Sequence, residues 1–458
     1  MAIGTKNVRY YYWLFLEFLK KHNKLIFLSF LISVITAISV VTISPYISST
    51  LIHTKRIVGL VGSYEPTNFD ALPDEVINKI SSGLTIINEK GVVLPMLATV
   101  WEISNDGKVY TFHLRHNVLL NNGELFTAKS ISLSFHDVTM KVIDDYTVQF
   151  TLQKPLAIFP LYLTKPIIVY PDVGVAGLYS VDKVKVKNGF IQEIQLSPNR
   201  KDSQPIIYVF YPSEGEMITD YKRGKITEMT ISNKTMADAF KSWNNTTVTK
   251  KVVYDKLLTL FYNQHNPLLA DRDFRSAIES SIDYSKFEDL GQLVSSPIPP
   301  ISWAYNPDLK KRETDIEFAK KTFSRLISAS ESGKLTLQTS YDYLDMADAI
   351  TNNLKDAGLQ ITVNMAAYSS TTPQFDLMLA YLKIPTDPDQ YYYWHSTQNL
   401  AQLLGYKNLK VDKFLEDGRS QYKGDERKAA YYDMQKTMRD DPPALFLFYP
   451  YVYTVKRK

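Results

Sequence analysis

The chain has 458 residues, and domains of about 150 residues each predict two or three of them. Apolar residues make up 45% and charged residues 22% of the sequence, which is typical of a globular protein and excludes a disordered one. The 52 basic and 48 acidic residues nearly balance, so charge predicts no nucleic acid partner, and the absence of cysteine excludes disulfides and thiolate metal sites.

The N-terminal part predicts a membrane anchor. No charged residue occurs between Lys24 and Lys55, and an apolar stretch of ~20 residues begins at Leu25, enough for a helix to cross a hydrocarbon core of ~30 Å. Five basic residues and one acidic residue precede the stretch, and such a basic excess stays in the cytoplasm. We therefore expect a cytoplasmic tail over 1–24, a single transmembrane anchor over 25–46 in the cell membrane, and an extracytoplasmic body.

Two alternatives to an anchor remain open. A buried core helix can be equally apolar, although its flanks are seldom so one-sidedly basic. A cleaved signal peptide usually has an apolar region of ~7–15 residues followed by small residues, whereas this stretch is longer and ends at Pro45 and Tyr46. An anchor and a signal peptide both place the body outside the cytoplasm.

The first part of the body predicts short strands and hairpins. The Asp106-Gly107 pair supplies the positive φ of a tight turn, and Thr127 is a favourable N-cap residue. We expect, in chain order, a strand at 56–61, a helix at 73–81, a hairpin at 101–115, a helix from Thr127 to Phe135, and a strand at 147–152.

The second part predicts longer helices that alternate with strands. Apolar residues recur at helical spacing at 273–282 and 314–330, and Gly358 ends a third helix. This alternation predicts a mostly parallel sheet with helices on its faces. The expected strands are 257–263, 335–339, 359–363, 375–382 and 444–455, and the expected helices are 273–282, 314–330, 343–357, 411–421 and 425–439.

Several segments resemble one family when they are taken in order. They are LPMLATVWEISNDGKVYTFHLR at 94–115, NGELFTA at 122–128, FYN at 261–263, DPD at 387–389 and DPP at 441–443. The set resembles the family 5 extracellular solute-binding proteins, the oligopeptide-, dipeptide- and nickel-binding components of ABC importers. The resemblance covers nearly all of the chain after residue 55.

This resemblance implies an α/β fold of the two-lobed periplasmic-binding-protein type (type II, Venus-flytrap), preceded here by the one transmembrane helix. Lobe 1 would comprise 55–255 with the C-terminal strand 440–458, and lobe 2 would comprise 256–439. Larger members insert a subdomain after the segment that corresponds to 127–135. Here Phe135 runs almost directly into the next strand, so this wall of the ligand cavity is expected to be shortened.

The resemblance also points to candidate ligand-binding residues. Members that hold peptides place an aspartate three residues before the Asp-Pro pair, where it binds the ligand's ammonium group. The equivalent residue is Ile384, which a core position at a strand end explains equally well, and a small shift of the alignment would give the role to Asp387. Tyr381 stands where the family often has tryptophan.

An aromatic run at Tyr391 to Trp394 follows the Asp387-Pro388-Asp389 segment and could stack on a ligand. The alternative is that these rings pack inside lobe 2. Tyr449 lies in the last strand, which the resemblance brings back toward lobe 1 near the cleft. Asp387 and Asp389 could form an acid and base pair, but capping of a helix is the stronger interpretation.

The function that follows is capture of a small-molecule or peptide ligand by hinge closure and its delivery to ABC permease subunits in the membrane. We expect a monomer with no catalytic residue, metal or cofactor. Fold alone does not fix function, so a tethered ligand sensor or chaperone-like module remains the alternative, and an extracellular hydrolase a more distant one.

Overall fold

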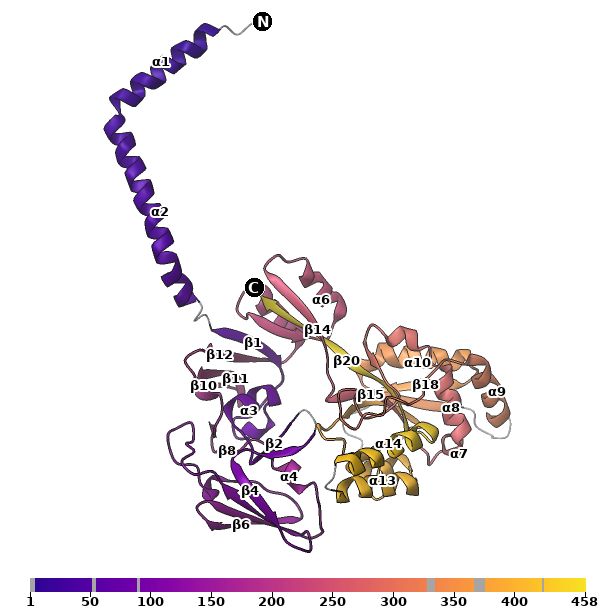
Figure 1. Cartoon of the computed structure of the whole chain (residues 1–458). Coiled ribbons are helices and arrows are strands. Elements are labelled where there is room, and N and C mark those ends of the chain that lie inside the picture. The colour runs from indigo at the N-terminus through magenta and orange to yellow at the C-terminus, as the bar shows by residue number, and fades with distance from the viewer. Residues whose placement is uncertain (1–4, 52–54, 89–90, 328–333, 366–374, 422–423) are drawn as a thin grey trace.

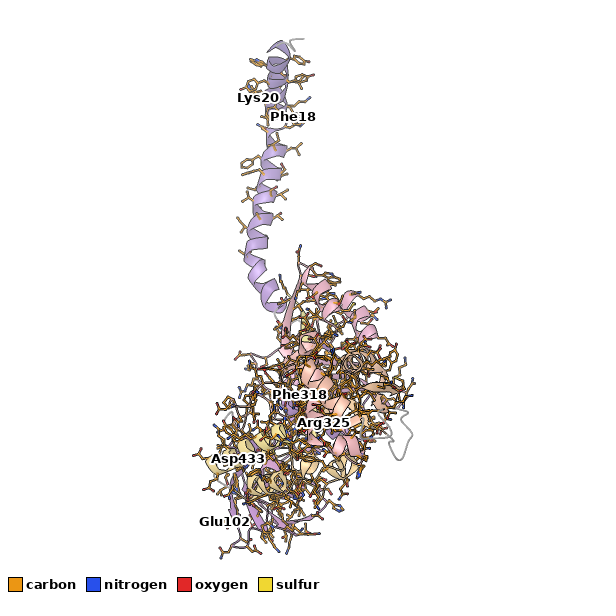
Figure 2. All side chains as sticks on the ribbon, turned by 90° about the vertical axis from the view of Figure 1, so that its right-hand side faces the viewer. Phe18, Lys20, Glu102, Phe318, Arg325 and Asp433 are labelled. Atoms are coloured by element: carbon orange, nitrogen blue, oxygen red, sulfur yellow. The ribbon has the colours of Figure 1, made fainter. Side chains whose placement is uncertain are left out.

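The computed structural model describes residues 5–51, 55–88, 91–327, 334–365, 375–421 and 424–458. Two N-terminal helices, α1 (Thr5–Lys21) and α2 (Asn23–Leu51), extend away from a two-lobed body, as Figures 1 and 2 both show. Among the described side chains, no single helix is long and apolar enough to cross a bilayer. Tyr10–Lys21 and Asn23–Ser39 meet that test only as a pair, with a bend of 75° between them.

The first lobe is built on a mixed sheet with β1 near its centre. Strand β1 (Arg56–Val61) pairs in parallel with β12 (Ile206–Tyr211) and β13 (Glu228–Ile231). The hairpin of β10 (Tyr179–Lys187) and β11 (Phe190–Pro198) extends the sheet from β12. The helices of this lobe are α3 (Asp74–Ile80), α5 (Glu214–Lys222) and α6 (Lys234–Lys241). The predicted strand at 56–61 and helix at 73–81 are therefore confirmed.

A small subdomain of the first lobe carries its own antiparallel sheet in the order β4-β5-β7-β6. Gly107, at φ 68°, makes the predicted tight turn, and Tyr110 and Phe112 point into the subdomain core with no exposed surface. The elements are β2 (Thr85–Ile87), β3 (Val93–Pro95), β4 (Ala98–Ile103), β5 (Val109–Leu114), β6 (Val138–Asp144), β7 (Thr147–Leu152), α4 (Phe159–Tyr162), β8 (Ile168–Val169) and β9 (Val173–Gly174).

The predicted helix from Thr127 to Phe135 is wrong. Only a 3-10 turn forms, at Ala128–Ser130, and the backbone is already extended at Ile131. Serines alternate with apolar residues at 130–135, and serine competes for backbone hydrogen bonds, so the segment favours an extended path over a helix. Phe135 then forms a bridge with Val138 at the start of β6, so the chain does run directly into the next strand.

The second lobe contains the predicted alternation of strands and helices, but its sheet is mixed rather than mostly parallel. Strand β17 (Lys334–Thr339) pairs in parallel with β18 (Gln360–Met365) and β19 (Leu377–Lys383), whereas β15 (Lys256–Tyr262) pairs antiparallel with β19. The helices are α7 (Pro267–Ala270), α8 (Arg272–Ser281), α9 (Ile316–Ile327), α10 (Leu344–Asp356), α11 (Tyr391–Trp394), α12 (Asn399–Leu404), α13 (Leu409–Ser420) and α14 (Gly424–Asp440).

The C-terminal strand β20 (Ala444–Arg457) belongs to both lobes and explains the mixed pairing. Its first half pairs antiparallel with β15 and β16 (Gly291–Leu293), up to Pro450. From Tyr451 onward it pairs with β14 (Thr246–Val252) and then β13 of the first lobe. Figure 1 shows this yellow strand running from one lobe into the other. The lobes are thus joined by two adjacent crossings, β20 and the β14–β15 connection.

Candidate binding cleft between the lobes

A cavity of about 790 Å³ lies between the first-lobe subdomain and the second lobe. The first lobe contributes the segment before β6, the end of β7 and helix α4, and the second lobe contributes α11 and the end of α13. Among the lining side chains are Phe135, Lys154, Phe159, Tyr162, Tyr391, Tyr392, Glu416 and Arg419. The cavity is therefore aromatic, carries charges of both signs, and needs both lobes to be complete.

The Asp387-Pro388-Asp389 segment positions the second-lobe wall through local hydrogen bonds. The Asp387 carboxylate accepts the backbone N–H of Asp389 at 3.0 Å, and the Asp389 carboxylate accepts the N–H of Tyr391 at 3.1 Å. The Asp389 carboxylate thus satisfies the N–H of the first residue of α11, whereas the Asp387 carboxylate closes a turn before the helix begins. The helix-capping interpretation therefore fits Asp389 in part and does not fit Asp387, since the N-cap residue of α11 is Gln390. Helix α11 presents Tyr391 and Tyr392 to the cavity.

Arg419 is the centre of a network that crosses the cleft. Its Nε donates to both oxygens of Asp389 at 3.1 and 3.0 Å, and its Nη2 donates to Oδ2 at 2.8 Å. The Tyr162 hydroxyl of the first lobe donates to the same Asp389 oxygen at 3.2 Å and accepts from Arg419 Nη2 at 3.4 Å. The guanidinium carbon lies 3.9 Å from the ring centroid of Tyr391 and 4.4 Å from that of Tyr392. A forked charged hydrogen bond and two cation–π contacts therefore hold Arg419 in one orientation.

This network is largely buried, and burial together with the charge of Asp389 determines its protonation. Burial raises the pKa of the Tyr162 hydroxyl well above its ordinary value, and the neighbouring Asp389 charge raises it further. Burial alone would lower the pKa of Arg419, but the hydrogen bonds and charge of Asp389 outweigh it and raise the pKa. The hydroxyl is therefore a neutral donor and the guanidinium a fixed cation at physiological pH.

A second ion pair holds the same segment against α14. Arg427 Nη2 lies 2.8 Å from Asp387 Oδ1, and the two side chains are only 10% and 6% exposed. Burial raises the pKa of the Asp387 carboxyl above its ordinary value, although Arg427 pulls it down. Because Arg427 already occupies this carboxylate, Asp387 supports the wall of the cleft and does not line the cavity.

The structure separates the predicted ligand-binding residues into two groups. Tyr391 lines the cavity, so ligand contact there remains a prediction with suitable geometry. The other five, Asp387 included, lie outside the described cavity lining. Ile384 and Trp394 are buried in the second-lobe core, Tyr449 is buried with its hydroxyl donating to the Pro297 carbonyl at 3.0 Å, and Tyr381 packs against Tyr343 with their ring centroids 5.1 Å apart.

Several cavity residues escaped the sequence analysis. Arg419 lies 30 residues from Asp389, and Tyr162 lies 227 residues from it, so the network joins distant parts of the chain. Neither residue belongs to a motif that would mark it. Glu416, three residues before Arg419 on α13, faces the cavity from the same helix face, a spacing that could have been noticed once Arg419 was suspected.

The lobes also meet at a smaller cavity of about 200 Å³, which Gly91 and Trp303 line from opposite sides. Gly91 has a φ of +74°, and a Cβ at this position would lie 1.9 Å from Nε1 of Trp303. Only glycine allows both this backbone conformation and this close approach.

Comparison with known proteins adds independent findings. The model of a family described as bacterial extracellular solute-binding proteins, family 5 middle, matches residues 92–401. The oligopeptide-binding protein AppA of Bacillus subtilis is 22% identical over 86% of this chain and 86% of its own length.

Two solved structures share the fold over 88% of this chain. NikZ of Campylobacter jejuni, in complex with Ni(L-His), has a TM-score of 0.69 at 22% identity and is covered over 94% of its chain. AppA of B. subtilis, in complex with a nonapeptide, has a TM-score of 0.66 at 20% identity and is covered over 94% of its chain.

Proposed function

The chain belongs to the family 5 bacterial extracellular solute-binding proteins, and from this premise we propose that it is the membrane-anchored binding component of an ABC importer. It captures a small ligand between its two lobes and delivers that ligand to permease subunits in the membrane. The cavity between the lobes carries the proposal, because residues of both lobes line it.

Hinge closure follows from the connections between the lobes. Within the described residues, β20 and the β14–β15 connection cross between the lobes, and they lie side by side in the sheet. Opening at the hinge would expose the cavity walls to solvent, and closure would complete them around a bound molecule. The permease would then recognise the closed form.

The cavity chemistry favours a peptide-like ligand. Glu416 supplies a carboxylate for an ammonium group, and Lys154 supplies an ammonium for a carboxylate. The rings of Phe135 and Tyr391 offer apolar surface to side chains. A volume of about 790 Å³ lies within the range of small-molecule sites. AppA, whose solved complex contains a nonapeptide, is consistent with this class.

The sequence and exposure of α2 support an anchor over 25–46. Its described apolar side chains point into solvent, including Phe27 at 68% exposed and Phe30 at 66%. Such exposure in a long uncharged helix is costly in water and favourable in lipid. Removal of 25–46 should release the protein from membranes, which fractionation of cells expressing both forms would measure.

Ligand identification tests the proposed function. The full chain is purified, its bound solute is extracted and identified by mass spectrometry, and thermal shift is then measured with that solute and a panel of short peptides. A ligand at 100 times its dissociation constant stabilises the folded state by ~2.7 kcal/mol.

A pair of variants makes the test specific to the cavity. Tyr392→Ala removes a ring from the cavity wall and should weaken the shift, whereas Tyr341→Ala, at an exposed site elsewhere on the second lobe, should not. If the ligand-induced thermal shift is the same in both variants, the cavity is not the binding site. If no solute copurifies and none stabilises the chain, the binding function itself fails.

A further inference from the structure

The first-lobe sheet has a strongly basic end where α2 reaches the body. Helix α2 ends at Leu51 and β1 begins at Arg56, so this end of the sheet is nearest the helix, as Figure 1 shows. The backbone N–H of Arg56 donates to the Pro205 carbonyl at 3.0 Å, which places the loop between β11 and β12 beside it. Exposed Arg200 and Lys201 lie in that loop.

Two further segments bring cations to the same end. Strand β13 pairs with β1 on one side and with the end of β20 on the other, so the start of β13 and the C-terminus lie together. The end of α5 and the loop before β13 carry exposed Lys222, Arg223 and Lys225. The last residues of β20 and the residue after it are Lys456, Arg457 and Lys458.

We call residues 55–56, 200–201, 222–225 and 456–458 the anchor-proximal basic surface. These segments hold ten Lys and Arg side chains. Four carboxylates neighbour them, which leaves a net side-chain charge of +6, whereas the entire chain carries only +4. The four are Glu75, Asp202, Asp220 and Glu228. The positive charge of the body is thus concentrated at the end next to α2.

We propose that the anchor-proximal basic surface docks onto anionic phospholipid headgroups of the membrane that holds the chain. The inference rests on the proposed anchor, which keeps this surface close to lipid. From residue 46 to Leu51 a helix rises ~8 Å, and the four residues to Lys55 add at most ~14 Å. Within such a distance each cation that reaches the headgroups gains attraction that decays over a Debye length of ~8 Å.

Docking has a consequence for transport. It would hold the first lobe against the membrane, while the second lobe, joined through β20 and the β14–β15 connection, remains able to move. Closure would then proceed as motion of the second lobe while the first lobe stays fixed, and α4 and α13, which line the cavity, would stay at the end of the body away from α2.

Fluorescence energy transfer tests the docking, because the chain contains no cysteine and accepts single labels. The full chain is reconstituted into phosphatidylcholine vesicles, or into an equal mixture with phosphatidylglycerol, that contain an acceptor lipid. A donor at Asn244→Cys reports on the surface, since the Asn244 carbonyl accepts from Lys458 at 3.0 Å. A donor at Glu102→Cys, at the far end of the body in Figure 2, is the control position.

The expected result is energy transfer from position 244 that rises with phosphatidylglycerol and falls again in high salt. The charge-reversed variant combines Lys201→Glu, Lys222→Glu and Lys456→Glu. Each basic residue near the surface contributes roughly fivefold to the ratio of docked to undocked protein, so the variant should lower that ratio by at least ~100-fold. The matched control has the same net charge but changes exposed lysines elsewhere on the body, and it should dock normally; it combines Lys141→Glu, Lys183→Glu and Lys187→Glu.

Flotation of the same samples separates docking from anchoring. If the protein floats with both lipid compositions but energy transfer at position 244 does not depend on the lipid, docking is overturned and the anchor stands. If the protein floats only with anionic vesicles and the charge-reversed variant does not float, the basic surface is supported and the anchor is overturned. If the protein floats with neither lipid composition, both docking and the anchor are overturned. A signal that appears only when a permease is added overturns lipid docking in favour of a protein partner.

Discussion

Tyr162→Phe should weaken closure of the lobes without unfolding either one. The change removes only the hydroxyl that bridges the cleft to Asp389 at 3.2 Å and to Arg419 at 3.4 Å. Hydrogen bonds to charged groups contribute ~1.5–3 kcal/mol, and these long distances favour the lower end, or about 1.5 kcal/mol. Because 1.4 kcal/mol is a factor of ten, the ratio of closed to open protein should fall about tenfold. Asp389 and Arg419 keep each other as partners, so no charge is stranded.

Energy transfer between the lobes measures this ratio. Donor and acceptor labels at Glu102→Cys in the first lobe and Asp433→Cys in the second report their separation, and both positions are labelled in Figure 2. Where the open form predominates without ligand, the apparent dissociation constant of the identified ligand should rise by the same factor, because it scales inversely with the closed fraction. Tyr341→Phe, whose residue is 79% exposed, removes a hydroxyl of no structural consequence and is the matched control.

The reasoning would be refuted by one combination of results. If Tyr162→Phe leaves both the interlobe separation and the ligand affinity equal to those of Tyr341→Phe, the bridge contributes nothing to closure. A fall in unfolding free energy of the same size as the loss of affinity would instead assign Tyr162 to the stability of its own subdomain.

Two other changes probe contacts at the cleft. Gly91→Ala should shift the lobes toward the open form, seen as a larger radius of gyration in solution scattering, because its Cβ would overlap Trp303. Gly123→Ala has the same left-handed strain at φ +89° with nothing within 4 Å, and it should keep the lobes closed. Arg427→Ala should lower the free energy of unfolding by ~3–5 kcal/mol in urea titrations, because it strands the buried Asp387 carboxylate; a loss below ~1 kcal/mol would contradict a strong buried pair.

Much of the fold could be predicted because its signals are local. The Asp106-Gly107 turn, the apolar spacing of α8 and the glycine after α10 each act within a few residues of the chain. The helix predicted at 127–135 failed where a weak N-cap signal competed with serines that favour extended backbone. The prediction of a mostly parallel sheet failed because β15 runs antiparallel to both of its neighbours, β19 and β20, and no local pattern encodes strand direction.

The cavity was harder to predict because its contacts are long-range. The family motif led to Asp387 and the aromatic run, and of those residues Tyr391 and Tyr392 face the cavity. The partners that complete the site, Tyr162 and Arg419, are separated by 257 residues in sequence. These two residues come into contact only when the two lobes pack against each other, and a single sequence contains no pattern that predicts this packing.

The shared strand β20 also sets an order of events during synthesis. Its 14 residues supply pairing partners to β13 and β14 on one side and to β15 and β16 on the other. Neither lobe can therefore complete its sheet before β20 has left the ribosome. A nascent chain would remain unfinished in both halves until then, a state suited to passage through an export channel in unfolded form.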